Sequence, residues 1–201
     1  MSDLRELIIS KSVEIIAESG IRGLSFREVA RRAKVSHQAP YHYFKSDSEI
    51  ISAIAKEGFK KLREAILDAS SKHPTQPIDA LNSAGIAYVQ FALNHQGHFR
   101  VMFQRTLLPN DVLIGSLDEA KEAYQALNDL VTRAMKLLQD NTLGVEGITM
   151  LCWSTAHGLA TLLSEGMGGI GNDEKLQTEL AARVLEALGG FLSSKGGRFS
   201  Q

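Results

Sequence analysis

The amino-acid sequence predicts an all-α protein, and three observations support this fold class. Apolar residues recur every three or four positions along most of the 201 residues, which is the period of a helix with one buried face. Ser-x-x-Glu signatures at 25–28, 46–49 and 116–119 are typical of helix starts. No stretch has the alternating pattern of a strand. With 44% hydrophobic and 22% charged residues, the composition is that of an ordinary globular protein.

The periodicity predicts about nine helices. The first ends at Gly20, a residue type that favours helix C-termini. Val35 and Ser36 turn the chain between the second and third helices, and Asn172 is expected to cap the last. The expected helices cover about 2–19, 25–34, 36–45, 46–70, 77–92, 98–103, 116–138, 145–165 and 172–192.

These helices divide into two expected domains. Residues 1–50 form a helix-turn-helix domain of three helices, and residues 51–201 form a larger helical domain. The boundary falls at the helix 46–70, because that helix belongs to both sides.

The segment 25–45 is basic in an otherwise nearly neutral chain. Five Lys or Arg stand against one acid, Glu28, so the local charge is +4 while the chain as a whole carries −1. Such a segment is the electrostatic footprint of a phosphate-binding surface. A solvated pair of amphipathic helices explains the same composition and stays open as an alternative.

The second half of this segment has an outward face that suits a DNA groove. Pro40 and Phe44 share one side of the expected helix 36–45, and a different set points largely the other way: Gln38, Tyr41, His42 and Lys45. An amide, a phenol, an imidazole and an amine make poor core material and good groove contacts.

The first 55 residues or so resemble the tetracycline-repressor-like (TetR) family of bacterial regulators. The resemblance is carried by Gly20, Gly23, Leu24, Ser25, Arg27, Val29, Ala30, Ala33, Val35, Ser36, Tyr41, Tyr43, Phe44 and Ile50. The sequence departs from the family at Pro40, which replaces an aliphatic residue, and at Asp47, which often is a lysine. Because Pro40 has no N–H to donate to Ser36, an irregular start of the recognition helix is expected.

The resemblance implies the residues that contact DNA. Arg27, His37, Gln38 and Ala39 are expected at base edges, and Tyr41, Tyr43 and Lys45 at phosphates. The complete expected set is Arg27, Ser36, His37, Gln38, Ala39, Tyr41, His42, Tyr43 and Lys45.

The C-terminal part resembles a TetR subgroup with a Trp-x-x-x-His-Gly element, here Trp153, His157 and Gly158. The four-residue spacing puts Trp153 and His157 on one helical face. His157 then lines a ligand pocket or a subunit interface. A core histidine with a satisfied hydrogen bond is the equally weighted alternative.

The resemblance also implies a homodimer in which the last two helices pair with their copies. The residues agree independently, because the helix 145–165 is apolar almost all round and so needs cover on more than one side. The expected interface residues are Met150, Trp153, His157, Leu180, Val184, Ala187, Leu188 and Phe191.

Aromatic and sulfur-containing residues recur at helical spacing in the larger domain, and such a set is more often core than binding site. The family, however, encloses a small-molecule cavity in this domain. The residues from which its lining is expected are Tyr88, Phe91, Met102, Phe103, Tyr124, Met135, Trp153 and His157.

No catalytic motif, resident cofactor or metal site is predicted. The sequence has no P-loop, GxSxG or HExxH signature. The single cysteine, Cys152, reads as a buried thiol, and only His95 and His98 have a metal-like spacing. Two uncharged runs, 80–99 and 147–164, are too polar for a membrane span. With no targeting segment visible, a cytoplasmic protein is expected.

The expected function is a ligand-responsive regulator that binds a palindromic DNA operator as a homodimeric repressor. A small molecule releases it by favouring a dimer with wrongly spaced recognition helices. Two alternatives stay open: a helical small-molecule carrier without a DNA role, and a cofactor-independent enzyme that uses the same cavity.

Overall fold

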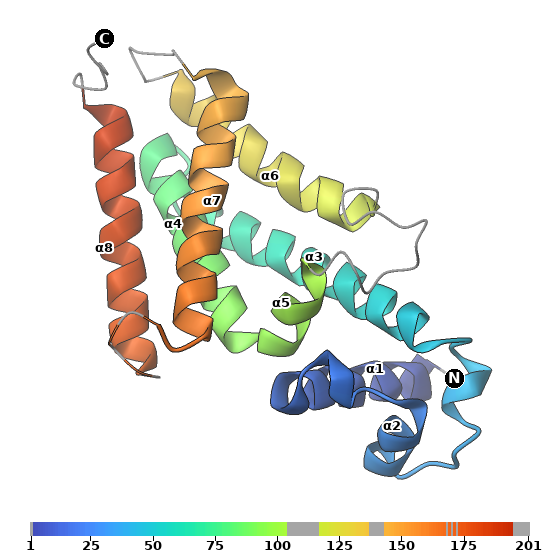
Figure 1. The fold of residues 1–201 in the computed structure, drawn as a ribbon. Coiled ribbons are helices and arrows are strands. Elements are labelled where there is room, and N and C mark those ends of the chain that lie inside the picture. Colours follow the sequence, from blue (N-terminus) through green and yellow to red (C-terminus); the bar gives the residue numbers. More distant parts are fainter. Residues whose placement is uncertain are drawn as a thin grey trace. The chain divides into compact units, whose positions relative to one another are not determined.

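The computed structural model describes residues 2–103, 117–136, 143–167, 169, 171 and 173–194. These residues form helices and turns, with no strand among them, so the predicted all-α class is confirmed (Figure 1). The eight α-helices are α1 (Ser2–Ser19), α2 (Phe26–Ala33), α3 (Asp47–Ser71), α4 (Pro77–Asn94), α5 (Gln96–Met102), α6 (Asp118–Met135), α7 (Gly144–Ser164) and α8 (Glu174–Ser193). Two single 3₁₀ turns, Ile21–Gly23 and Pro40–His42, complete the described part.

The prediction of an α-helix at 36–45 is wrong, and this accounts for the eight α-helices found among the described residues where about nine were expected. The segment 36–43 is instead a run of tight turns that ends in the 3₁₀ turn Pro40–His42. Pro40 has no N–H with which to reach the Ser36 carbonyl, so the Ala39 N–H donates to that carbonyl at 3.0 Å. The next three donors also bond three residues back rather than four, until Phe44 N–H reaches Pro40 O. The proline thus tightens the whole segment.

The helix α8 has a different N-cap residue from the one expected. Asp173, not Asn172, caps α8, because its carboxylate accepts from the N–H groups of Lys175 and Leu176 at 3.0 and 3.1 Å. Asn172 itself and the expected cap Ser116 lie outside the described residues.

The chain divides into two compact units, and α3 runs through both. One unit, here the N-terminal unit, contains residues 1–61 and 95–121, and the other, the C-terminal unit, contains 62–94 and 122–201. The division inside α3 agrees with a helix that serves both sides. Residues 95–121 also belong to the first unit, whereas the boundary expected at residue 50 assigned them to the second domain.

In the N-terminal unit, α5 packs closely on α1. A Cβ added to Gly97 would overlap the backbone carbonyl oxygen of Val13, so only glycine allows this approach. Arg100 then donates from Nη1 to the carbonyls of Ile16 and Ala17, at 3.2 and 2.8 Å. These carbonyls belong to the last turn of α1, which has too few partners within its own helix. Arg100 therefore acts as a cap supplied by α5.

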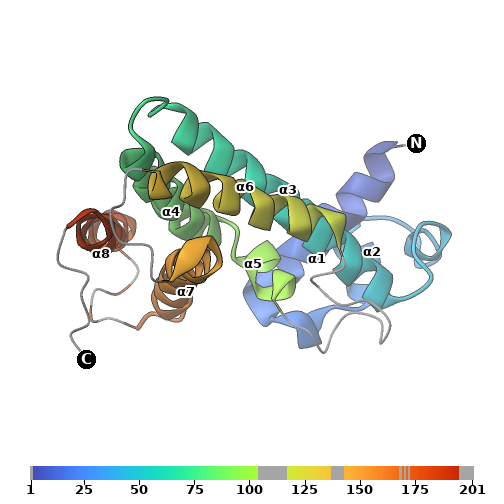
Figure 2. The same cartoon turned by 90° about the horizontal axis from the view of Figure 1, so that it is seen from above.

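In the C-terminal unit, α4 packs against α7 and α8 (Figures 1 and 2). The helices α4 and α8 meet at glycines. A Cβ on Gly85 would lie 3.2 Å from the Leu185 side chain, and one on Gly189 would overlap the Asn82 side chain. The buried Gln177 amide donates to Leu163 O and Gly171 O and so ties α8 to the end of α7.

Across the ranges described above, no helix combines the length and the apolar character that crossing a membrane requires.

Candidate DNA interface and effector cavity

The turn between α2 and the segment 36–45 is built by caps at both ends of α2. Ser25 Oγ accepts from Glu28 N–H at 3.3 Å, as the capping-box pattern predicts. At the other end, Lys34 adopts the left-handed conformation with φ 56°. The N–H groups of Lys34 and Val35 donate to Arg31 O and Ala30 O, which is the Schellman arrangement. This tight stop directs the chain into the exposed segment.

Two aromatic contacts hold the exposed segment against the helices of its own unit. Phe44 is buried, with the Arg5 guanidinium of α1 5.2 Å from its ring centre. Tyr41 packs edge-to-face on Phe26 of α2 at 4.4 Å between ring centres, although 58% of Tyr41 stays exposed. The segment 36–45 is therefore an anchored surface element and not a loose loop.

The structure separates the residues expected at DNA by their exposure. Most are exposed: Arg27, Ser36, His37, Gln38, Tyr41, His42 and Lys45. Tyr43 is half-buried, and Ala39 is buried at 8% exposure. The methyl group of Ala39 thus has little surface to offer, because it packs inward beside Pro40.

The basic character of this surface is smaller than the sequence count suggests. Arg31 and Arg32 both bond the Glu28 carboxylate, and Arg32 also bonds Glu18 of α1 at 2.6 Å. The hydrogen bonds from Arg31 and Arg32 lower the pKa of Glu28 to about 2, so its charge persists at neutral pH. Arg32 therefore braces α2 against α1, while Arg31 is paired within α2.

Three cations of the segment stay outside this network. Within the part of the chain that the structure describes, no carboxylate lies within ion-pair distance of Arg27, Lys34 or Lys45, and all three are exposed. Lys34 was not among the residues expected at DNA. Its left-handed backbone is a position where glycine costs less, so a lysine there places a charge at the turn despite the conformational cost. In the sequence, Lys34 could have been included in the DNA-contacting set because it is a basic residue directly before the Val35-Ser36 turn.

The start of α3 adjoins this surface along the chain. Ser46 Oγ accepts from Glu49 N–H at 3.4 Å, and the Glu49 carboxylate accepts from Lys45 N–H at 2.8 Å. The second capping box is therefore present, with its return bond shifted by one residue. Asp47 is the first residue of α3, and partial desolvation raises its pKa.

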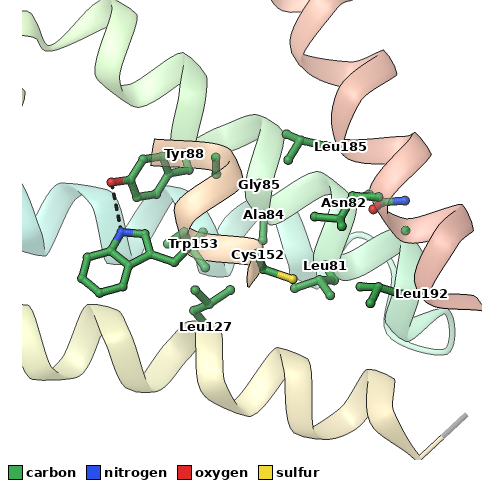
Figure 3. A pocket seen from close by; sticks show the side chains of 14 residues that line it. Leu81, Asn82, Ala84, Gly85, Tyr88, Leu127, Cys152, Trp153, Leu185 and Leu192 are labelled. Carbon is green, nitrogen blue, oxygen red and sulfur yellow. Dashed lines mark hydrogen bonds between the residues drawn. The ribbon is translucent and has the colours of Figure 1, made fainter. Parts of the chain in front are cut away.

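A small cavity of about 40 Å³ lies in the C-terminal unit (Figure 3). Five helices line it. The lining residues are Ile66, Leu81, Asn82, Ala84, Gly85, Tyr88, Leu127, Cys152, Trp153, Ala156, Leu185, Leu188, Gly189 and Leu192. Figure 3 shows Tyr88 and Trp153 together at one end of this lining and Asn82 with Leu192 at the other.

A polar cluster stands at the Tyr88 end. Trp153 Nε1 donates to the Tyr88 hydroxyl at 3.4 Å, and that hydroxyl lies 2.8 Å from His157 Nδ1 (Figure 3 draws the first bond). Burial lowers the pKa of His157 and raises that of Tyr88, so both are neutral at pH 7. His157 is half-buried and is hydrogen-bonded, as the core-histidine alternative requires, and it is not a lining residue.

Of the residues from which the lining was expected, Tyr88 and Trp153 line this cavity. Met102 and Phe103 belong to the N-terminal unit, where Phe103 packs on Phe59 and Phe99. Phe91 and Met135 are buried elsewhere, and Tyr124 is partly exposed, with its ring edge-on to Trp153. Most of the lining consists of small and aliphatic residues, which no motif marks. The glycines Gly85 and Gly189, inside otherwise regular helices, were the available signal.

The helices α7 and α8 leave apolar side chains uncovered within the chain. On α8, Leu176 and Phe191 are 44% and 48% exposed, and on α7 Met150 and Leu162 are 52% and 49% exposed. Ala187 is also exposed, whereas Leu180, Val184, Leu188 and Trp153 are half-buried. The outward residues of α8 follow each other at intervals of three or four, so they form one stripe: Leu176, Leu180, Val184, Ala187 and Phe191.

The cysteine and the histidine pair singled out in the sequence lie in the packed interior or beside it. Cys152 is buried, and desolvation raises its pKa to about 11, which keeps it a thiol. His98 is buried with Nε2 3.3 Å from Glu57 Oε1, and Glu57 also pairs with Lys61. Among the described residues, no three His, Cys, Asp or Glu side chains are grouped as metal ligands would be.

Comparisons with known proteins agree with this architecture. The chain resembles a protein of unknown function from Rhodococcus sp. RHA1 (24% identity, 95% and 96% of the two chains, TM-score 0.79). It also resembles a tetR-family regulatory protein from Rhodococcus RHA1 (19%, 96% and 98%, TM-score 0.76). A third similar structure is FadR from Bacillus subtilis, a transcriptional regulator solved with stearoyl-CoA (18%, 92% and 97%, TM-score 0.71).

The search of curated proteins gave no match. Two family models do match: residues 8–54 match "bacterial regulatory proteins, tetR family", and residues 81–188 match "tetracyclin repressor-like, C-terminal domain". The second match covers more than half of the chain. Together with the exposed, anchored turn after α2 and the cavity of the helical C-terminal unit, these matches place the chain in the tetR family of bacterial transcriptional regulators.

Proposed function

We propose that this protein is a homodimeric repressor that binds a palindromic operator in the cytoplasm and is released by a small-molecule effector. The observation that carries the DNA part is the segment 36–45, whose polar side chains are exposed although its backbone is anchored through Phe44 and Tyr41. An anchored, exposed polar surface costs little entropy on binding.

The DNA contacts divide into base readers and phosphate contacts. His37 and Gln38 are exposed residues of the turn and, with Arg27, are proposed to meet base edges. Tyr41, Tyr43, His42 and Lys45 are proposed to meet the groove walls, with Ser36 beside them. Lys34 joins the phosphate contacts because it is exposed, has no acidic partner among the described residues and lies at the same turn.

The dimer is proposed to form through α7 and α8. The stripe Leu176, Leu180, Val184, Ala187 and Phe191 is apolar. Leu176, Ala187 and Phe191 are exposed in one chain and Leu180 and Val184 are half-buried, and α7 adds the exposed Met150 and Leu162. Exposed apolar surface of this continuity is typical of an interface. A two-fold dimer places its two reading segments about 34–36 Å apart, one turn of DNA.

The effector is proposed to act through α3. Ile66, near its C-terminal end, lines the cavity, while Asp47–Lys61 belong to the N-terminal unit. FadR was solved with stearoyl-CoA, and this supports a small-molecule effector for a chain of the same fold. A ligand that fits one arrangement of α3 better than another shifts the population of dimers that match the operator.

Footprinting on the DNA upstream of the protein's own gene tests the proposal. We expect protection of two inverted half-sites whose centres are about 10–10.5 base pairs, or a multiple of that, apart. Protection of a single half-site, or of none, would contradict the dimeric repressor.

Gln38→Ala tests the base readers. Gln38 is exposed, and its described hydrogen bond, from Tyr41 N–H to Gln38 O, is made by the backbone, so the change should leave folding intact. A lost bidentate base contact costs about 1–3 kcal/mol and relaxes the preference at one position of each half-site. Binding to a panel of single-base operator variants measures this, with Arg22→Ala, an exposed residue of the preceding turn Ile21–Gly23, as a control that should keep the preference. An unchanged preference at every position in the Gln38 variant would remove this residue from the readers.

A further inference from the structure

The chemistry of the cavity lining restricts the ligand that it accepts. Among the described residues that line it, none is acidic or basic. The polar groups on it are the Asn82 amide, the Tyr88 hydroxyl, the Trp153 N–H and the Cys152 thiol, and all of them are neutral at pH 7. A carboxylate or phosphate moved there from water loses its hydration and meets no cation in return, which makes its burial costly.

The size of the cavity shows that it has to open. An apolar cavity of about 150 Å³ holds benzene, whereas this one measures about 40 Å³. A ligand larger than a few atoms must therefore displace lining side chains. Three lining leucines are only half-buried, and two of them, Leu188 and Leu192, belong to α8.

The helix α8 therefore has two functional sides. Leu185, Leu188, Gly189 and Leu192 face the cavity, and the stripe from Leu176 to Phe191 faces outward. Its contact with α4 is a close one at Gly85 and Gly189, because the Leu185 side chain packs on Gly85 and the Asn82 side chain packs on Gly189. A ligand that pushes the leucines of α8 outward must also move that stripe.

We propose that the effector is an uncharged, mainly apolar molecule, which enters the cavity by displacing Leu188 and Leu192 of α8. The inference rests on the proposed function, since it names the ligand class of the regulatory site. It disfavours free fatty acids and acyl-CoA thioesters, whose charged groups the lining cannot compensate.

The fluorescence of Trp153 tests this directly. Trp153 is the one tryptophan of the sequence and lines the cavity, so its emission reports on that site. The probes are 1-octanol and octanoate at pH 7.5, which share an eight-carbon chain and differ in charge, and stearoyl-CoA. We expect a saturable change with 1-octanol at a Kd at least about tenfold lower than that for octanoate. Equal or tighter binding of octanoate or stearoyl-CoA would overturn the proposal.

Two variants and a matched control locate the binding. Leu188→Ala enlarges the cavity in advance and should strengthen 1-octanol binding severalfold. Ala156→Leu fills it and should weaken binding by a similar factor. Leu67→Ala is the same truncation at an exposed leucine of α3 outside both the lining and the stripe, and it should leave the octanol affinity unchanged. If Leu188→Ala and Leu67→Ala behave alike, octanol does not enter beside Leu188. Leu188→Ala keeps the test valid if Ala156→Leu does not fold.

DNA binding without any probe is measured in parallel, so that the two failures stay separate. Operator binding without octanol binding would overturn the inference and leave the regulator intact. Octanol binding that follows the variants, in a protein without operator binding, would support the ligand class and contradict the proposed function.

Discussion

Phe191→Glu is expected to turn the dimer into a monomer and to abolish operator binding. Phe191 is 48% exposed in the single chain, so the change leaves the fold of one subunit intact. In the proposed dimer the new carboxylate is buried without a partner, which costs about 3–5 kcal/mol. The dimerisation constant should fall by more than about a hundredfold. Analytical ultracentrifugation and operator titration at the same concentrations measure the two effects.

Lys175→Glu is the matched control for this change. It places the same side chain on the same helix, on the charged side that also carries Glu179. We expect it to stay dimeric and to bind the operator. A Phe191→Glu protein that remains dimeric and binds DNA normally would exclude α8 from the interface.

Gly97→Ala is expected to destabilise the N-terminal unit, because this glycine lies against the backbone of α1. Its Cβ would overlap the Val13 backbone carbonyl, which cannot turn away as a side-chain tip can. Overpacking of this kind costs about 1–3 kcal/mol. The bonds from Arg100 to Ile16 O and Ala17 O should lengthen with it. Denaturant unfolding, with hydrogen exchange of the α1 amides, measures the loss.

Gly190→Ala serves as the control, because a Cβ there meets nothing within 4 Å. In the interior of α8 it should raise stability by about 0.5–1 kcal/mol, the usual gain of alanine over glycine in a helix. Equal stability of the Gly97 variant and the unmodified protein would show that α5 does not rest on the α1 backbone.

The sequence predicted the regular elements well because their signals are local. Ser25 and Ser46 cap α2 and α3, as their Ser-x-x-Glu patterns indicate, and Pro77 begins α4. Local chemistry also explains the irregular segment 36–45, since Pro40 lacks the N–H that an α-helix needs there. The effect extends beyond the expected irregular start: the following bonds have three-residue spacing, and no α-helix forms.

What could not be predicted depends on contacts between distant residues. The pairing of Arg32 with Glu18 spans 14 positions and withdraws a charge from the basic segment. The return of α5 to α1 depends on Gly97 meeting Val13, which no periodicity reveals. The cavity lining could not be predicted for a similar reason, because the sequence does not distinguish an aliphatic residue in the core from one beside a cavity, as with Leu127 and Leu185. Of the aromatic and sulfur-containing residues expected there, only Tyr88 and Trp153 line it.

The most direct test of the central claim, a regulator that reads DNA through the segment 36–45, is a salt titration on two DNAs. One carries the sequence upstream of the protein's own gene, and the other is a random duplex of equal length. We predict that the upstream DNA binds about 10³-fold or more tightly than the random duplex at physiological salt. The logarithm of each affinity should fall linearly with the logarithm of salt concentration, because Lys34, Lys45 and their neighbours displace counterions. Equal affinities for the two DNAs, or no binding to either at about 50 mM salt, would contradict it.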